Sequence, residues 1–148
     1  MSLCIASGGK VVALVASSFT LSWSHSVAHT EWWERWEVTA QGLRPVEARI
    51  LGAGAGMEPP ADAVRRADGW HYRPSLPPQR EVLLAASGAT GGGWRLCARG
   101  DCLDLGAEPG APLRLWLAAH CETGGGAGTP PVRSPVRAQM QPVPSVGP

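Results

Sequence analysis

The sequence predicts an all-β protein, either an antiparallel β-sandwich or a partly open barrel of about nine short strands. Short segments alternate between apolar and polar residues with a period of two, which is typical of half-buried strands. Turn residues separate these segments, and the chain has 19 glycines and 14 prolines in 148 residues. No long segment makes a convincing helix, so we expect strands throughout the domain.

The N-terminal residues predict a hairpin followed by a third strand. Leu3 and Ile5 alternate with small or polar neighbours, and Gly8-Gly9 indicates a two-residue turn into a strand over Lys10–Ala16. Phe19–Trp23 then places a bulky apolar residue at every second position. This alternation is the clearest strand pattern in the chain.

The segment after Glu31 fits two interpretations. Trp32, Trp33 and Trp36 fit a helical stripe, whereas Trp36 and Val38 alternate with polar residues as in a strand. The many β-forming residues favour the strand. One helical turn is expected at Ala61–Asp68. Further strands are expected at Val46–Ile50, Trp70–Arg73, Glu81–Ala86, Trp94–Cys97, Cys102–Leu105 and Leu113–Ala119.

The domain organisation follows from a change in composition after Cys121. Residues 1–122 are expected to form a single β domain, whose length suffices for one hydrophobic core. Thr123–Pro148 is rich in Gly, Pro and Ser and contains few large apolar side chains. Because such a segment buries little apolar surface to offset its conformational entropy, we predict a disordered tail at 123–148.

Charge and hydropathy exclude several classes of partner. Thirteen basic and twelve acidic residues give a formal net charge of +1, so neither nucleic acid nor an anionic membrane surface is an expected partner. No apolar run is long enough to span a bilayer. The N-terminus also lacks the pattern of an export signal, which predicts either a cytoplasmic protein or one whose signal was removed or lies upstream.

The sequence predicts no cofactor. The glycine-rich segment Gly52–Gly56 follows an expected strand, as a dinucleotide-binding loop does. Met57 occupies the position of the third required glycine, however, and Glu58-Pro59-Pro60 cannot begin the required helix. We therefore interpret this segment as a tight loop.

The four cysteines allow three interpretations. Cys97 and Cys102 flank a turn, and a cross-strand disulfide between them is expected in an oxidising compartment. Cys4 and Cys121 lie at the two ends of the expected domain and could join its first and last strands. Free buried thiols are the second interpretation. A zinc site formed by Cys97, Cys102, His120 and Cys121 is the third, but adjacent residues 120 and 121 would point to opposite faces of a strand.

The densest group of polar and aromatic residues is Trp23–Val38, with the sequence WSHSVAHTEWWERWEV. It suggests a polar patch whose candidate ligand-binding residues are His25, Ser26, Thr30, Glu34 and Glu47. These side chains include the nucleophile, base and carboxylate that a hydrolase needs. No Gly-x-Ser-x-Gly motif surrounds Ser26, so no complete catalytic motif exists and we do not expect an enzyme. A ligand-binding or protein-binding patch and a purely structural corner stay open as alternatives.

Several motifs together resemble the bacterial domain-of-unknown-function 1850 family over about Leu3–Leu105. The motifs are Phe19–Val27 with Thr30, Glu34 and Val38, then Val46–Arg49, Gly54–Met57, Asp68–Trp70 and Trp94–Cys97. Ala28-His29 stands where the family has Glu-Lys.

The resemblance implies a small exported protein of the kind often encoded beside tripartite ATP-independent periplasmic (TRAP) transporters. No reaction is established for the family. The implied location is therefore the periplasm, and the implied partners are the subunits of a TRAP-type transporter or its solute. The implied role is an accessory or binding module, and export would favour the Cys97–Cys102 disulfide.

Overall fold

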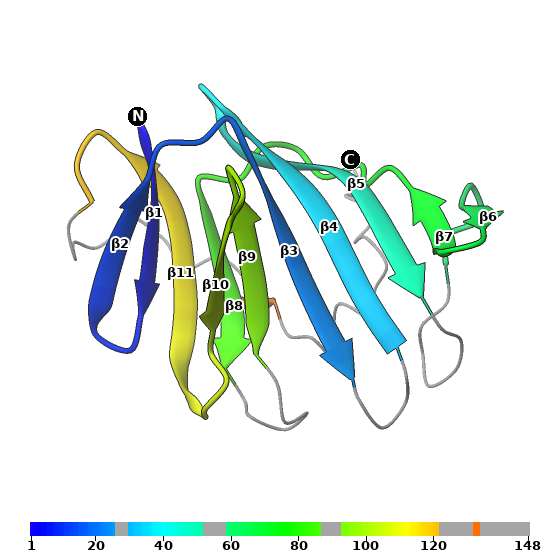
Figure 1. Cartoon of the computed structure of the whole chain (residues 1–148). Helices are drawn as coiled ribbons and strands as arrows, with labels where there is room; N and C mark the ends of the chain where they lie inside the picture. The colour runs from blue at the N-terminus through cyan, green and yellow to red at the C-terminus, as the bar shows by residue number, and fades with distance from the viewer. Residues whose placement is uncertain (26–29, 52–58, 87–92, 122–131, 134–148) are drawn as a thin grey trace.

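The computed structural model describes residues 1–25, 30–51, 59–86, 93–121 and 132–133 (Figure 1). Within these residues the chain forms strands joined by turns and irregular segments, with no helix, so the expected all-β fold is confirmed, as a sandwich rather than a partly open barrel. The predicted glycine-rich loop at Gly52–Gly56 lies outside the described residues. No helix in the described part of the chain is long and apolar enough to cross a membrane.

Two sheets face each other. The five-stranded sheet has the order β12-β8-β11-β1-β2, and the seven-stranded sheet has the order β10-β9-β3-β4-β5-β7-β6. The strands of the first are Val132–Arg133 (β12), Glu81–Ala86 (β8), Gly110–Ala118 (β11), Ser2–Ser7 (β1) and Lys10–Leu14 (β2). The strands of the second are Asp101–Leu105 (β10), Trp94–Ala98 (β9), Ser18–His25 (β3), Thr30–Thr39 (β4), Gly42–Leu51 (β5), Gly69–Tyr72 (β7) and Val64–Arg66 (β6).

The predicted N-terminal hairpin is confirmed. Gly8 and Gly9 both have positive φ values, 58° and 81°, which fit the tight turn between β1 and β2. β1 also pairs with β11 in antiparallel register, so β2 forms the edge of this sheet. The first strand of the chain thus lies between its sequence neighbour and a strand more than a hundred residues later (Figure 1).

The ambiguous tryptophan-rich segment is a strand. β4 pairs with β3 on one side and with β5 on the other, which satisfies the backbone groups of both edges of β4. Trp32 and Trp36 are buried, whereas Trp33 between them is only partly buried. This alternation agrees with a period of two rather than with a helical stripe.

The expected helical turn at Ala61–Asp68 is wrong. Val64–Arg66 forms β6, a short strand that pairs in antiparallel register with β7. Strand pairing gives the backbone partners that one isolated helical turn would leave unpaired. Gly69, the first residue of β7, allows β7 to lie close to Ile50 of β5. Its φ is 121°, and a Cβ at this position would collide with the carbonyl of Ile50.

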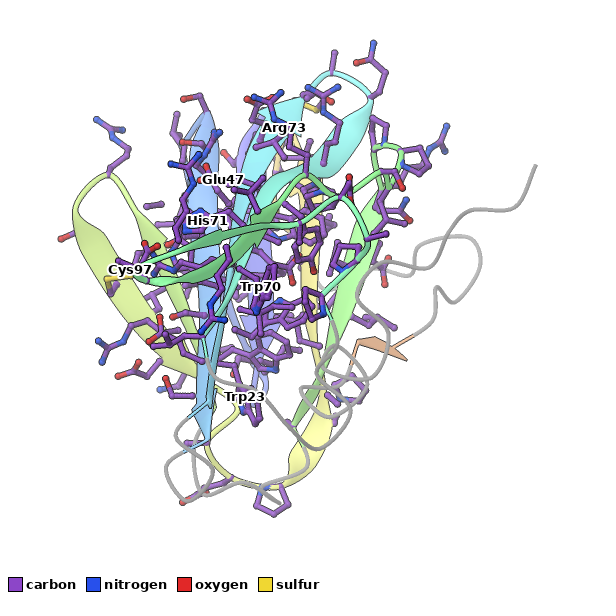
Figure 2. The ribbon with its side chains drawn as sticks, turned by 90° about the vertical axis from the view of Figure 1, so that its right-hand side faces the viewer. Trp23, Glu47, Trp70, His71, Arg73 and Cys97 are labelled. Carbon is purple, nitrogen blue, oxygen red and sulfur yellow. A yellow bond between two sulfur atoms is a disulfide. The ribbon has the colours of Figure 1, made fainter. Side chains whose placement is uncertain are left out.

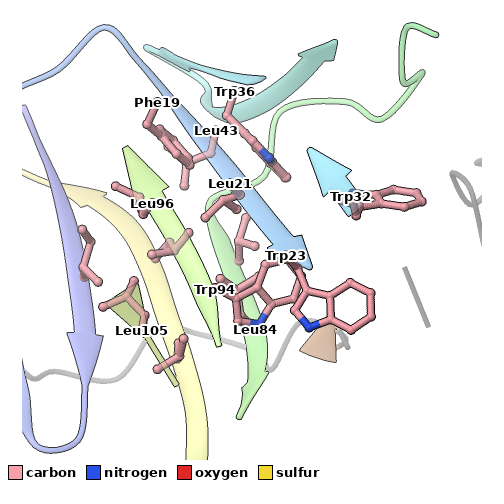
Figure 3. Packing of buried hydrophobic residues seen from close by; sticks show 14 of the residues in the cluster. Phe19, Leu21, Trp23, Trp32, Trp36, Leu43, Leu84, Trp94, Leu96 and Leu105 are labelled. Carbon is pink, nitrogen blue, oxygen red and sulfur yellow. The ribbon is translucent and has the colours of Figure 1, made fainter. Parts of the chain in front are cut away.

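The core lies between the two sheets and is dominated by indole rings (Figure 3). Trp23, Trp32, Trp36 and Trp94 of the seven-stranded sheet are each at most 2% exposed. Phe19 stacks on its cross-strand partner Trp36, with ring centroids 6.0 Å apart and planes 10° apart. The facing sheet contributes aliphatic side chains, including Leu3, Ile5, Leu84, Leu113 and Leu115. Burial of these large apolar surfaces is the main stabilising contribution to the sandwich.

The predicted tail at 123–148 lies mostly outside the described residues. Its described part is Val132–Arg133, which forms β12 and pairs in parallel register with β8. The boundary predicted after residue 122 stays a prediction.

Candidate functional site

The predicted polar corner lies where β3 ends and β4 begins. His25 is the last residue of β3 and Thr30 the first of β4, and their backbones pair directly across the two strands. Ser26 lies outside the described residues. The structure thus brings the backbones of His25 and Thr30 together at one end of the seven-stranded sheet.

Glu34 lies on the core side of β4. It is 2% exposed and accepts a hydrogen bond of 2.7 Å from the indole Nε1 of Trp32 to its Oε1. A buried carboxylate without partners would be costly, and a charged hydrogen bond offsets part of that cost. Glu34 therefore belongs to the interior between the two sheets.

Glu47 lies on the outer side of the same sheet. Its Oε2 is 3.2 Å from Nε of Arg35, the residue directly opposite on β4. Arg35 Nη1 lies 3.7 Å from Glu37, and Arg44 donates to Glu37 at 3.0 Å. These four side chains form a half-exposed ion-pair network in which each carboxylate has a guanidinium partner.

The five candidate residues do not form one described cluster. Glu34 and Glu47 are on opposite faces of the seven-stranded sheet, and the sheet itself separates their carboxylates. This division follows from the alternation of side chains between the two faces of a strand. On β4, Glu34 is on the same face as the buried tryptophans, whereas Arg35 is on the other face. Glu47 is the direct partner of Arg35 on β5 and therefore shares that outer face.

A hollow of about 740 Å³ opens beside Glu47, over β4 to β7. We call it the arginine hollow. Its charged and polar lining residues are Arg35, Glu37, Arg44, Glu47, Asp62, Arg66, His71 and Arg73, and its other lining residues are Val46, Val64 and Tyr72. Figure 2 labels Glu47, His71 and Arg73, which lie near one another in that view.

Sequence reasoning missed the arginines of this hollow. They lie on β4, on β5, on β6 and directly after β7. The last two segments reach the hollow only because β7 pairs with β5 and β6 pairs with β7. Arg35 and Glu37 alternate with buried residues on β4, and this pattern was the available sign of a charged outer face.

A second polar cluster lies next to the arginine hollow. His71 Nε2 is 2.6 Å from Asp68 Oδ1, and Arg49 Nη1 is 3.1 Å from Asp68 Oδ2. The hydrogen bond from His71 lowers the pKa of the Asp68 carboxyl below 3.8, and the charges of His71 and Arg49 act in the same direction. Arg49 also lies over the ring of Trp33, 4.9 Å from its centroid. This cluster ties β5 to the β6–β7 turn.

A smaller hollow of about 430 Å³ lies at the other end of the sheet, on the side of the predicted corner. Its lining includes Ser22, Ser24, Glu31, Arg95 and Asp104. Arg95 Nε donates to Asp104 Oδ1 at 3.0 Å. That bond lowers the pKa of Asp104 and raises the pKa of Arg95. Arg95 and Asp104 are therefore paired with each other, and Glu31 is paired with Arg49 at 3.5 Å.

All four cysteines are in disulfides, and the predicted Cys97–Cys102 bond is confirmed. These two residues are direct cross-strand partners on β9 and β10, with Cα atoms 4.1 Å apart. Cys4 of β1 is bonded to Cys121, three residues after the end of β11. The free-thiol and zinc interpretations are wrong, because a disulfide sulfur is neither a thiol nor a thiolate ligand.

The fold and its outer face define a small disulfide-linked β-sandwich with a polar, hollowed surface on the larger sheet. A family model described as a domain of unknown function, DUF1850, matches residues 19–105. This match covers more than half of the chain, so the protein belongs to the domain-of-unknown-function 1850 family, as its motifs predict. Searches of curated proteins and of solved structures each gave no match.

Proposed function

We propose that this protein is an extracytoplasmic binding module that works with a TRAP-type solute uptake system. Family membership supports the proposal through the gene neighbourhoods that the resemblance implies. The two disulfides support an oxidising compartment such as the periplasm, because reducing cytoplasms rarely retain structural disulfides.

The observation that carries the binding role is the arginine hollow. A sandwich core does not require a hollow of this size on its outer face, and small-molecule sites commonly have volumes of about 300–1,000 Å³. Glu47, one of the predicted site residues, lines it. The proposed role is binding, with no bond-making step assigned to any residue.

The decisive experiment measures solute uptake and partner capture in cells. Deletion of the gene is expected to reduce uptake by the neighbouring TRAP system, and tagged wild-type protein is expected to co-purify with a transporter subunit. A His25→Ala/Glu47→Ala double variant should fold and yet restore less uptake. Glu47 suits this test because its exposed ion pair contributes little stability.

The matched control is Glu108→Ala, which removes an exposed carboxylate that lines neither hollow. It should behave as wild type. Normal uptake in the deletion strain, together with no captured transporter subunit, would refute the association. A serine-directed covalent probe followed by mass spectrometry tests the hydrolase alternative, for which labelling of Ser26 is required.

A further inference from the structure

The carboxylates on the β4–β5 side of the arginine hollow form ion pairs with arginines of the same hollow. Glu47 is bound by Arg35 at 3.2 Å, and Glu37 is bound by Arg44 at 3.0 Å. These pairs fix four charged side chains along one wall. A ligand entering the hollow therefore meets preformed ion pairs on this side.

Two further arginines lie on the β6–β7 side of the hollow. Arg66 and Arg73 are exposed and line the hollow, yet neither forms an ion pair or a hydrogen bond within the described part of the chain. Elsewhere on the described surface, arginines beside carboxylates are paired, as Arg49 is with Asp68 and Arg95 with Asp104. The two guanidinium groups thus remain available to a ligand.

The balance of charge favours an anion of low charge. Four arginines line the hollow against Glu37, Glu47 and Asp62, which leaves a formal surplus of one positive charge with His71 neutral. A polyanion or a doubly charged phosphate would carry more negative charge than this single surplus balances, and it would lie beside the carboxylate of Asp62. A guanidinium is planar and donates two parallel hydrogen bonds to a carboxylate.

Apolar surface is also present in the same hollow. Val46 of β5 is partly buried, Val64 of β6 is 56% exposed, and both line it beside the charged groups. Tyr72 also lines it but is only 5% exposed. Pockets for small organic molecules combine such apolar contacts with a few polar groups that set orientation. The chemistry therefore matches a ligand with both a hydrocarbon part and a carboxylate.

We propose that the arginine hollow binds a small organic carboxylate, whose carboxylate group is held by Arg66 and Arg73 and whose hydrocarbon part rests on Val46 and Val64. This inference rests on the proposed binding function and names the ligand class of that site. Arg35 and Arg44 keep Glu37 and Glu47 neutralised, which lowers the repulsion that the bound anion would otherwise meet.

Isothermal titration calorimetry on the full disulfide-bonded chain tests this at low ionic strength. The probes are lactate, glutamate and benzoate, each with a net charge of −1, with glucose as the neutral comparison and inorganic phosphate as the second anion. At least one carboxylate should bind with a dissociation constant of about 1 mM or tighter. Arg66→Gln and Arg73→Gln should each weaken it about tenfold or more, because each loses a charge-assisted hydrogen bond.

Arg80→Gln is the matched control, since Arg80 is another exposed arginine that does not line the hollow. It should bind the carboxylate as wild type does. All three variants should keep the wild-type melting temperature, because none of these arginines has an ion pair among the described residues. A loss of binding can then be assigned to the missing guanidinium rather than to unfolding.

Three results would overturn the ligand class: no binding of any carboxylate probe, binding of glucose or phosphate alone, or carboxylate binding unaffected in both arginine variants. Failure of this ligand class can be distinguished from failure of the proposed function. Capture of a transporter subunit by the Arg66→Gln/Arg73→Gln double variant at wild-type level would retain the TRAP association while the carboxylate site fails. Carboxylate binding without any effect of gene deletion on uptake would support the carboxylate site and contradict the TRAP association.

Discussion

Trp32 donates a hydrogen bond of 2.7 Å to Glu34, two residues further along β4, and both side chains are buried in the sandwich core. The pair combines the largest apolar side chain with a carboxylate on the same face of one strand. Glu34 is the one charged residue in the buried part of the described chain. The surrounding core sets its position, so we expect Glu34 to have a structural role.

Removing this carboxylate should destabilise the fold. Glu34→Ala leaves the Trp32 indole N–H without its acceptor and opens a gap beside it, so we expect a loss of about 1–3 kcal/mol in the free energy of unfolding. Urea denaturation followed by tryptophan fluorescence measures it. Glu37→Ala, on the exposed side of the same strand, should change stability by about 0.5 kcal/mol or less. Equal losses in the two variants would contradict the assigned role.

The two disulfides should differ in their contribution to stability. The Cys4–Cys121 bond closes a loop of 117 residues and the Cys97–Cys102 bond one of 5. Loop-closure entropy predicts about 5 kcal/mol for the first and about 2 kcal/mol for the second. Paired Cys→Ala variants compared by denaturant unfolding test this order. A larger loss on removing the short-range bond would show that chain entropy does not govern their effects.

Gly42 should be intolerant of a side chain. Leu43 and Gln79 exchange two backbone hydrogen bonds of 2.7 Å, and a Cβ on Gly42 would collide with the carbonyl of Gln79. Its φ of 133° is also unfavourable for other residues. Gly42→Ala should therefore cost about 1–3 kcal/mol or more. Gly110→Ala, where a Cβ meets open space, is the control in the same thermal unfolding assay.

The acid titration of Asp68 should reveal its bond to His71. The hydrogen bond to His71 lowers the pKa of Asp68 in the folded state below 3.8. Because the folded pKa is below the unfolded one, this interaction stabilises the fold above about pH 4 and is lost as the pH falls through the folded pKa. Carboxyl carbon NMR should give a midpoint below 3.8 in wild type.

In His71→Ala the Asp68 midpoint should return toward 3.8, while Asp104 keeps its low midpoint. Arg95→Gln should have the opposite pattern, because Arg95 is the main cause of the lowered pKa of Asp104. If His71→Ala leaves the Asp68 midpoint unchanged, then the hydrogen bond is not its cause.

Strand alternation made much of the fold predictable. Phe19, Leu21 and Trp23 are buried where a period of two places them, and the Gly8-Gly9 turn joins the first two strands. The turn between Cys97 and Cys102 likewise indicated their pairing. The strand at Val64–Arg66 was not predictable in this way. It is too short to show an alternating pattern, and its strand conformation depends on pairing with β7.

The sequence by itself determined that this chain is an all-β protein of the domain-of-unknown-function 1850 family, because local periodicity, turn residues and ordered motifs are all properties of neighbouring residues. It left a sandwich and a partly open barrel as alternatives, and the two sheets of the structure decided for the sandwich. The tertiary structure alone decided how the candidate polar residues are distributed. It placed Glu34 in the core and Glu47 on the outer face, and it assembled Arg35, Arg66 and Arg73 around one hollow. The physical reason is strand pairing, which sets the neighbours of a side chain across the sheet and cannot be read from spacing along the chain.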